Sequence, residues 1–171
     1  MIHALALLLL LLGRAAAAPP KPLAGYNEIV VERFTVETSC EFSPLQSDAV
    51  QQTTVTRLRA KKLAAVIDCL DAAGAEAAGA PPGDGVKRLK VTATVVEFAR
   101  GSRTARSIGI GAGATKLRVR FTIKDAVTGA ELVTTEHLGR YSYGGGTNEA
   151  GFTAVACEVV DGLIADIERN R

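Results

Sequence analysis

The chain has 171 residues, of which 47% are hydrophobic, and it carries 20 basic and 18 acidic side chains. A disordered chain is excluded, because disorder goes with low hydrophobicity and high net charge. The length suits one domain with a single core, and the near-balance of charge indicates no particular kind of partner.

Residues 1–18 are typical of a secretory signal peptide. Residues 4–12 form an unbroken apolar run rich in leucine, Arg14 follows it, and residues 15–18 are alanines of the size that signal peptidases accept. Because a membrane-spanning helix needs about 20 apolar residues, we expect cleavage at the last alanines. The first cysteine is Cys40, so the cleavage point lacks the cysteine of a lipoprotein. The sequence predicts an exported protein, periplasmic or secreted, with no stable membrane span.

The first half of the remaining chain predicts one strand and one helix. Residues 19–27 contain prolines and predict a flexible lead-in. Residues 28–36 are rich in β-branched residues and predict a buried strand. Residues 47–71 predict an amphipathic helix, N-capped by Ser47 or Asp48. Its expected apolar stripe consists of Val55, Leu58, Leu63, Val66, Ile67 and Leu70.

The second half predicts an antiparallel meander followed by a helix. Residues 73–85 are rich in alanine, glycine and proline and predict a connector. Residues 88–95 and 116–124 alternate apolar with polar side chains, which predicts two half-buried strands. A Thr-Gly pair then signals a turn, and residues 132–141 predict a third strand. From Asn148 onward, apolar residues recur with helical spacing to the end of the chain, which predicts the last helix.

The expected order is β-α-β-β-β-α, which predicts an α+β two-layer sandwich in a single domain spanning residues 28–171. The sheet is expected to have four mostly antiparallel strands. Both helices should cover one face, because the inward side chains of the strands are the only large apolar surface available to them. The opposite face should be exposed to water.

Basic residues concentrate in the middle of the chain. Residues 86–140 hold 11 basic and 4 acidic side chains. On the exposed face of the predicted sheet these include Arg88, Lys90, Lys116, Arg118, Arg120 and Lys124. Such a face is either an interaction surface for an anionic partner or an ordinary solvated face. Glu131 and Glu136 on the neighbouring strand are placed to neutralise part of it by cross-strand pairing.

Glycines alternate with other residues in the segment before the second strand of the meander. They open a strand, whereas the glycines of nucleotide-binding motifs open a helix, so a nucleotide site is not indicated. One interpretation is a tightly packed or bulged start of the strand. The other is an anion-binding loop, in which nearby arginines would hold the ligand. Its candidate residues are Arg100, Arg103, Arg106, Gly109, Gly111 and Gly113.

Three stretches of sequence suggest a family. Residues 98–101, residues 106–113 and the Asp-x-x-Thr-Gly turn at residues 125–129 resemble a family of uncharacterised exported bacterial proteins with an Arg/Gly-rich loop, an alternating strand and this turn. More loosely, the element order is similar to the periplasmic domains of curli-secretion and penicillin-binding-protein-activator lipoproteins. The resemblance covers roughly residues 28–168 and implies a non-catalytic envelope protein. It supplies no active site, and many such proteins begin with a lipid-attachment motif that this chain lacks.

No catalytic, metal or cofactor motif is present in the sequence. After signal removal His137 is the one histidine, which leaves no histidine cluster for zinc and no spare imidazole for general base catalysis. Ser142 lacks the Gly-x-Ser-x-Gly context of a hydrolase nucleophile. Tyr141 and Tyr143 next to glycines could stack on a sugar or a base, but the exposed sheet face has no aromatic residues and no RNA-binding platform is indicated.

The chain has three cysteines, in a compartment where disulfides form. In the expected topology Cys40 and Cys157 lie toward the same end of the domain, so they are the plausible disulfide pair. Cys69 would then be a buried free thiol. The alternative that all three cysteines are reduced stays open.

Two classes of function remain. The favoured one is a non-catalytic binding or assembly module of the bacterial envelope that acts on another envelope protein. The alternative is a binder of an anionic polymer, lipopolysaccharide or cell-wall glycan, through the basic residues at positions 86–140. An unrecognised hydrolase is a more distant alternative. No cofactor and no nucleic acid are expected.

Overall fold

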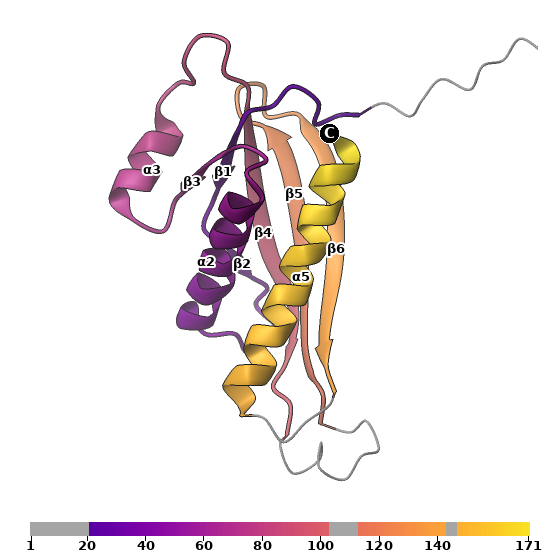
Figure 1. Ribbon diagram of the computed structural model, residues 1–171. Helices are drawn as coiled ribbons and strands as arrows, with labels where there is room; N and C mark the ends of the chain where they lie inside the picture. Colours follow the sequence, from indigo (N-terminus) through magenta and orange to yellow (C-terminus); the bar gives the residue numbers. More distant parts are fainter. Residues whose placement is uncertain (1–20, 103–112, 143–146) are drawn as a thin grey trace, which may run out of the picture.

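Three long strands form the predicted antiparallel meander in the computed structural model, which describes residues 21–102, 113–142 and 147–171. They are β4 (Arg88–Ala99), β5 (Thr115–Asp125) and β6 (Glu131–Tyr141). Alternate side chains of β4 and β5 are buried on one face, as the period of two predicts. Figure 1 shows the sheet with the last helix, α5 (Asn148–Asn170), lying along it.

A β-bulge lets β4 run beyond the alternating stretch that the sequence indicates. The register with β5 shifts between Val95 and Glu97, so Val96 is the extra residue. Val95 lies opposite Val119, whereas beyond the bulge Glu97 pairs with Arg118. The bulge therefore resets the alternation and turns Glu97 to the outer face of the sheet.

The predicted helix over residues 47–71 is wrong in its second half. The helix, α2, spans Pro44–Lys61, and Ser43 caps it in a capping box with Gln46. It ends where Lys62 takes a left-handed conformation with φ of 53°. Val66 and Ile67, predicted on the helical stripe, belong to a short strand, β3 (Ala65–Asp68).

The sheet is mixed and six-stranded, which corrects the expected four mostly antiparallel strands. The predicted strand at residues 28–36 is broken into β1 (Glu28–Val31) and β2 (Thr35–Val36), and both pair in parallel with β4. β1 also pairs in parallel with β3. The order across the sheet is β3-β1-β4-β5-β6, with β2 alongside β4. The parallel half arises because α2 connects β1 to β3 as a crossover.

Two helices cover one face of the sheet, as predicted. α5 begins at Asn148 with Thr147 as N-cap, and it buries an apolar stripe against the sheet. α2 buries the same kind of side chains on the same face, in one common core. The core residues contributed by the two helices are Val50, Val55, Leu58, Val155, Ala156, Val159, Val160, Leu163, Ile164 and Ile167.

The opposite face is partly covered, which corrects the expectation that it is exposed throughout. The predicted connector contains a short helix, α3 (Ala72–Gly79), with Asp71 as N-cap. The side chain of Val30, whose neighbours Ile29 and Val31 point into the core, is only 3% exposed on the other face. Figure 1 shows α3 beside β3 and β1, apart from α2 and α5.

The predicted flexible lead-in is packed against the domain from residue 21 onward. Leu23 is fully buried in the core, and its N–H donates to the carbonyl of Asn170 at 2.9 Å. The hydroxyl of Tyr26 donates to Asp125 at 2.6 Å. These contacts tie residues 21–27 to the domain predicted over residues 28–171. The predicted signal peptide, residues 1–18, lies outside the described residues.

Candidate functional site

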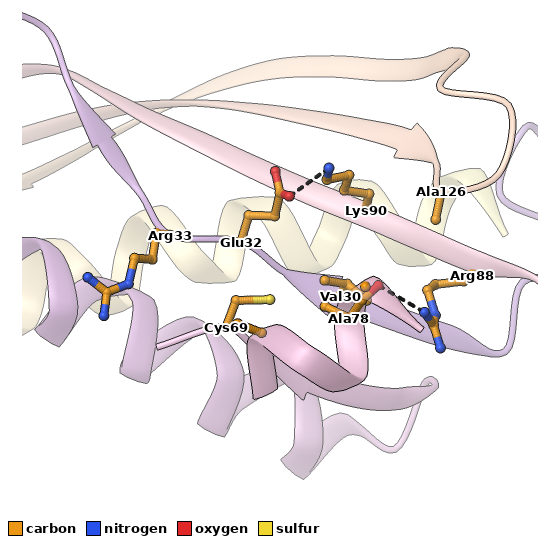
Figure 2. Close-up of a pocket in the computed structure, with 10 residues that line it drawn as sticks. Val30, Glu32, Arg33, Cys69, Ala78, Arg88, Lys90 and Ala126 are labelled. Atoms are coloured by element: carbon orange, nitrogen blue, oxygen red, sulfur yellow. Dashed lines mark hydrogen bonds and ion pairs between the residues drawn. The ribbon is translucent and has the colours of Figure 1, made fainter. Parts of the chain in front are cut away.

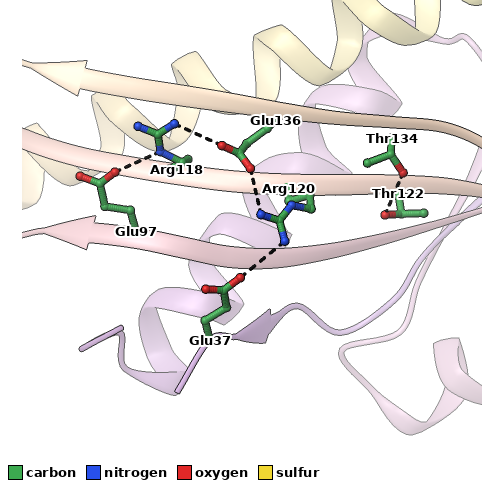
Figure 3. Close-up of polar contacts among 7 residues, drawn as sticks. All are labelled: Glu37, Glu97, Arg118, Arg120, Thr122, Thr134 and Glu136. Carbon is green, nitrogen blue, oxygen red and sulfur yellow. Dashed lines mark hydrogen bonds and ion pairs between the residues drawn. The ribbon is translucent and has the colours of Figure 1, made fainter. Parts of the chain in front are cut away.

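An ion-pair cluster occupies the centre of the outer face of the sheet (Figure 3). Arg118 on β5 binds Glu97 at 3.0 Å and Glu136 at 3.2 Å. Arg120, two residues along the same strand, binds Glu136 at 3.2 Å and Glu37 at 3.5 Å. We call these five residues the outer-face cluster. The hydrogen bonds from Arg118 and Arg120 lower the pKa of Glu136, although partial burial opposes this shift.

The outer-face cluster joins carboxylates from three separate parts of the chain. Glu136 lies on β6 directly opposite Arg120, and this was the cross-strand pairing that the sequence allowed. Glu37 follows β2, and Glu97 is turned outward by the bulge in β4. The ion pairs that Glu37 and Glu97 make with the arginines were not predicted. The first depends on the pairing of β2 with β4 and the second on the bulge in β4, and neither feature can be recognised from the pattern of residues.

Arg88, predicted on the interaction surface, is instead a buried structural residue. It is 7% exposed and forms an ion pair with Glu28. Its guanidinium also donates to the carbonyls of Ala78 at 3.1 Å and Ala80 at 2.6 Å, at the C-terminal end of α3. A cation is favourable at a helix C-terminus, where carbonyls lack partners. Arg88 therefore fixes α3 to the outer face.

Lys90 and Lys124, two of the three lysines predicted on the exposed face, lie at outward positions of β4 and β5. Lys90 forms an ion pair with Glu32 at 2.6 Å. Lys124 stands opposite Glu131 in the register of β5 and β6. The outer face thus carries both signs of charge close together, and its arginines are held by carboxylates of the same chain.

A hollow of about 510 Å³ lies between α3 and the outer face (Figure 2). Figure 2 shows Lys90 and Glu32 on one side, Cys69 opposite them, and Arg33 and Arg88 toward the two ends. The wall from α3 is made of small residues, which do not fill the space against Val30. Those wall residues are Ala75, Ala78 and Gly79. The hollow has room for a small molecule, with a charged pair at its side.

All three cysteines are free thiols in the structure, so the predicted Cys40–Cys157 disulfide is not formed. Cys40 lies beside the backbone of Phe98, whereas Cys157 lies beside Arg57 on the side of α5 that faces α2. Cys69 lines the hollow beneath α3, and burial raises the pKa of its thiol. A raised pKa keeps a thiol protonated and unreactive at neutral pH.

Most of the predicted anion-binding loop lies outside the described residues. This applies to Arg103, Arg106, Gly109 and Gly111. Arg100 is exposed just after β4. At the base of the loop, the N–H of Ser102 donates to the carbonyl of Gly113 at 3.0 Å. Gly113 has a φ of 81°, a conformation that favours glycine. The anion-binding role of this loop stays a prediction.

His137 belongs to a polar cluster between β6 and α5. Its Nε2 lies 2.9 Å from Asp166 Oδ2 and 3.2 Å from the hydroxyl of Thr135. A catalytic triad needs the imidazole to bridge its two partners through different nitrogens. Here both partners meet the same nitrogen, and Thr135 also donates directly to Asp166 at 2.6 Å. The geometry is that of a structural hydrogen-bond cluster.

The Asp-x-x-Thr-Gly motif is a turn that closes the hairpin of β5 and β6. Asp125 Oδ1 accepts hydrogen bonds from the N–H groups of Val127 at 2.9 Å and Thr128 at 2.7 Å. These bonds, with that from Tyr26, lower the pKa of Asp125 to about 2. Gly129 follows with a φ of 73°. The motif thus shapes the turn: the Asp side chain binds the backbone N–H groups that follow it, and the Gly adopts the left-handed conformation that ends the turn.

Two negative findings concern the residues that the structure describes. Among them, no group of three or more His, Cys, Asp or Glu side chains is arranged to hold a metal ion. No helix within the same ranges is long and apolar enough to cross a bilayer.

Solved structures share this fold at low sequence identity. A PelC dodecamer from Paraburkholderia phytofirmans is 18% identical, with a TM-score of 0.54 over 84% of this chain and 89% of that chain. The hypothetical protein CT253 from Chlamydia trachomatis is 13% identical, with a TM-score of 0.55 over 84% and 96%. Lipoprotein GNA1162 from Neisseria meningitidis is 15% identical, with a TM-score of 0.46 over 81% and 99%. At these identities the likeness of the first two structures concerns the fold alone, and the TM-score of the third is too low to support an argument.

No curated protein matches the chain. A family model matches residues 29–145, which include β2 to β6, all of β1 except its first residue, and the Asp-x-x-Thr-Gly turn. The predicted membership of a family of unknown function is therefore confirmed, whereas the particular motifs named for it stay a prediction. The chain belongs to the family described as Domain of unknown function (DUF4410).

Proposed function

We propose that the protein is an exported, non-catalytic binding or assembly module of the bacterial envelope, and that its partner is another protein. The observation that carries this proposal is the outer-face cluster. Arg118 and Arg120 each bind two carboxylates of the same chain. A surface with both charges interspersed and already paired is suited to a polar protein contact and has little attraction for a polyanion.

The same observation weighs against the anionic-polymer alternative. A sulfate, phosphate or uronate group would have to displace Glu97, Glu136 or Glu37 from the two arginines. That exchange replaces one charge-assisted contact by another and so gains little free energy. Four basic residues of the range 86–140, Arg88, Lys90, Arg118 and Arg120, are therefore paired with carboxylates, some of which lie outside that range.

The partner proposal is tested by affinity purification from envelope fractions at low and at moderate salt, with the chain from residue 19 onward as bait. We expect a discrete protein that survives the change of salt, since the paired charges contribute little long-range attraction. In parallel, purified lipopolysaccharide and cell-wall glycan are titrated at both salt concentrations. Tight polymer binding that collapses with salt, without a protein partner, would contradict the proposal in favour of the alternative.

Export is tested separately. We expect the full chain, produced in a Gram-negative bacterium, to be recovered from the periplasm or the medium with its first residues removed. Mass spectrometry of the intact protein should place the new N-terminus after Ala17 or Ala18. Recovery of the uncleaved chain from the cytoplasm would contradict this prediction.

A further inference from the structure

β6 forms one edge of the sheet. Among the described residues it pairs with β5 on one side and has no neighbouring strand on the other. It is 11 residues long, from Glu131 to Tyr141. Figure 1 shows it as the outermost strand on the side away from β1 and β3. An edge of this length presents backbone groups that a further strand can bind.

One hydrogen bond shows which backbone groups face the free edge. The N–H of Arg140 donates to the carboxylate of Glu158 on α5 at 2.8 Å, so it points away from β5. In an antiparallel ladder, backbone direction alternates from residue to residue. Leu138, Glu136 and Thr134 therefore also direct their N–H and C=O groups to the free edge. Their side chains stand on the outer face, and that of Leu138 is 42% exposed.

The edge carries few of the features that prevent strands from adding to it. β6 contains no proline and no lysine, the residues that most often protect exposed edges. The charge of Glu136 is engaged by Arg118 and Arg120. Glu158 covers the N–H of Arg140. The stretch from Thr134 to Leu138 is left open.

The position of α5 limits which kind of chain can pair with the free edge of β6. α5 lies directly against β6, because a methyl group at Gly139 would overlap the backbone of Val155 and one at Gly162 would overlap the ring of His137. Two copies paired through β6 would each bring an α5 helix and the exposed carboxylate of Glu158 to the same side of the joined edges. Helices that need about 8–10 Å between their axes and two like charges would crowd one another there. An extended segment without a helix meets neither obstacle.

We propose that the free edge of β6 binds an extended segment of a partner protein, which adds as a strand beside Thr134–Leu138 and places a basic side chain next to Glu158. The inference rests on the proposed function and names its binding surface. Side chains of the added strand that point to the helix-covered face lie beside Glu158, which is exposed. Those on the outer face meet Leu138, which favours an apolar residue there.

The test uses a synthetic peptide of about seven residues, a common strand length, in which lysine alternates with valine. Amide hydrogen exchange is measured by NMR with and without excess peptide. The expected result is a slowing of at least about tenfold at the amides of Thr134, Glu136 and Leu138, since each gains a partner. The amides of Thr135 and His137 already face β5 and should change little. A peptide with glutamate in place of lysine should bind more weakly.

Two variants make the test specific to the edge. Leu138→Lys places a lysine at the centre of the open stretch and should abolish the added protection. Leu45→Lys, at a residue that is 81% exposed on α2, is the matched control and should leave it intact. Absence of protection with the lysine peptide, or protection that persists in Leu138→Lys, overturns the edge site. If the Leu138→Lys variant still captures a protein partner in the affinity purification, the edge of β6 is not the binding surface, but the proposed function as a protein-binding module is still supported.

Discussion

At the scale of single residues, Gly139 sets the distance between the sheet and α5. A side chain at this position would overlap the backbone carbonyl of Val155. We expect Gly139→Ala to lower the free energy of unfolding by about 1–3 kcal/mol, because strand and helix must move apart in a packed core. Urea unfolding measures the change. The control is Gly79→Ala at the end of α3, where an added methyl meets nothing within 4 Å. Equal stability of Gly139→Ala and the unaltered chain would show that this close contact is absent.

Asp125 makes the turn between β5 and β6 sensitive to acid. Its pKa falls from the ordinary value of 3.8 to about 2 in the folded protein, chiefly through the N–H of Thr128 and then the hydroxyl of Tyr26. A depressed folded-state pKa stabilises the fold above the unfolded-state pKa, and this contribution is lost as the pH falls from 3.8 toward 2. We therefore expect Asp125→Asn to be destabilising at pH 7 and the difference from the unaltered chain to shrink near pH 2. Urea unfolding at the two pH values measures this. A difference that stays constant with pH would contradict the assignment.

At the scale of elements, the end of α2 depends on the unusual conformation of Lys62. Its φ of 53° is one that glycine adopts without strain. We expect Lys62→Gly to raise the free energy of unfolding by up to about 1 kcal/mol, whereas Ala60→Gly, inside the same helix and exposed, should lower it by about 1 kcal/mol. Thermal unfolding of the two variants gives the comparison. The same sign for both would indicate that the helix continues past Lys62.

The error over α2 shows where the pattern of residues stops being informative. α5 and the three strands of the meander were predictable because each has one uninterrupted period of its own. Val66 and Ile67 fit both a helical stripe and a short strand. They form a strand because β1 offers a parallel edge, a partner more than thirty residues away in sequence. A short apolar run cannot distinguish these two cases without knowledge of its neighbours.

The candidate site was predictable to a similar extent. The outward placement of Arg118 and Arg120 followed directly from the alternation of apolar and polar side chains along β5. Their pairing with Glu37 and Glu97 did not, since it requires β2 beside β4 and a bulge in β4. The sequence therefore indicated a basic face where the structure has a face of paired charges.

At the scale of the whole molecule, the two ends of the sheet differ. The C-terminus, the β5–β6 turn and the segment around Leu23 lie at one end, as Figure 1 shows. The strands and the helix that flank residues 103–112 and 143–146 meet at the other end. A partner strand on β6 would run between these ends.

The segment before β1, residues 21–27, contacts the C-terminal end of α5. Its removal should therefore destabilise the whole domain. Leu23 is fully buried beside the end of α5, and Tyr26 binds the β5–β6 turn. We expect Leu23→Ala to cost about 2–5 kcal/mol of unfolding free energy, the usual range for a buried leucine. A chain that begins at Glu28 should lose at least as much, because it also lacks the bond from Tyr26 to Asp125.

Lys21→Ala, at an exposed position in the same segment, is the matched control and should unfold with the unaltered chain. Urea unfolding of the chain from residue 19, the two variants and the shortened chain measures the series. If the shortened chain were as stable as the longer one, residues 21–27 would be an appendage and the domain would begin at β1. If it is weaker, residues 21–27 belong to the folded domain, and the proposed signal cleavage would have to fall before Leu23.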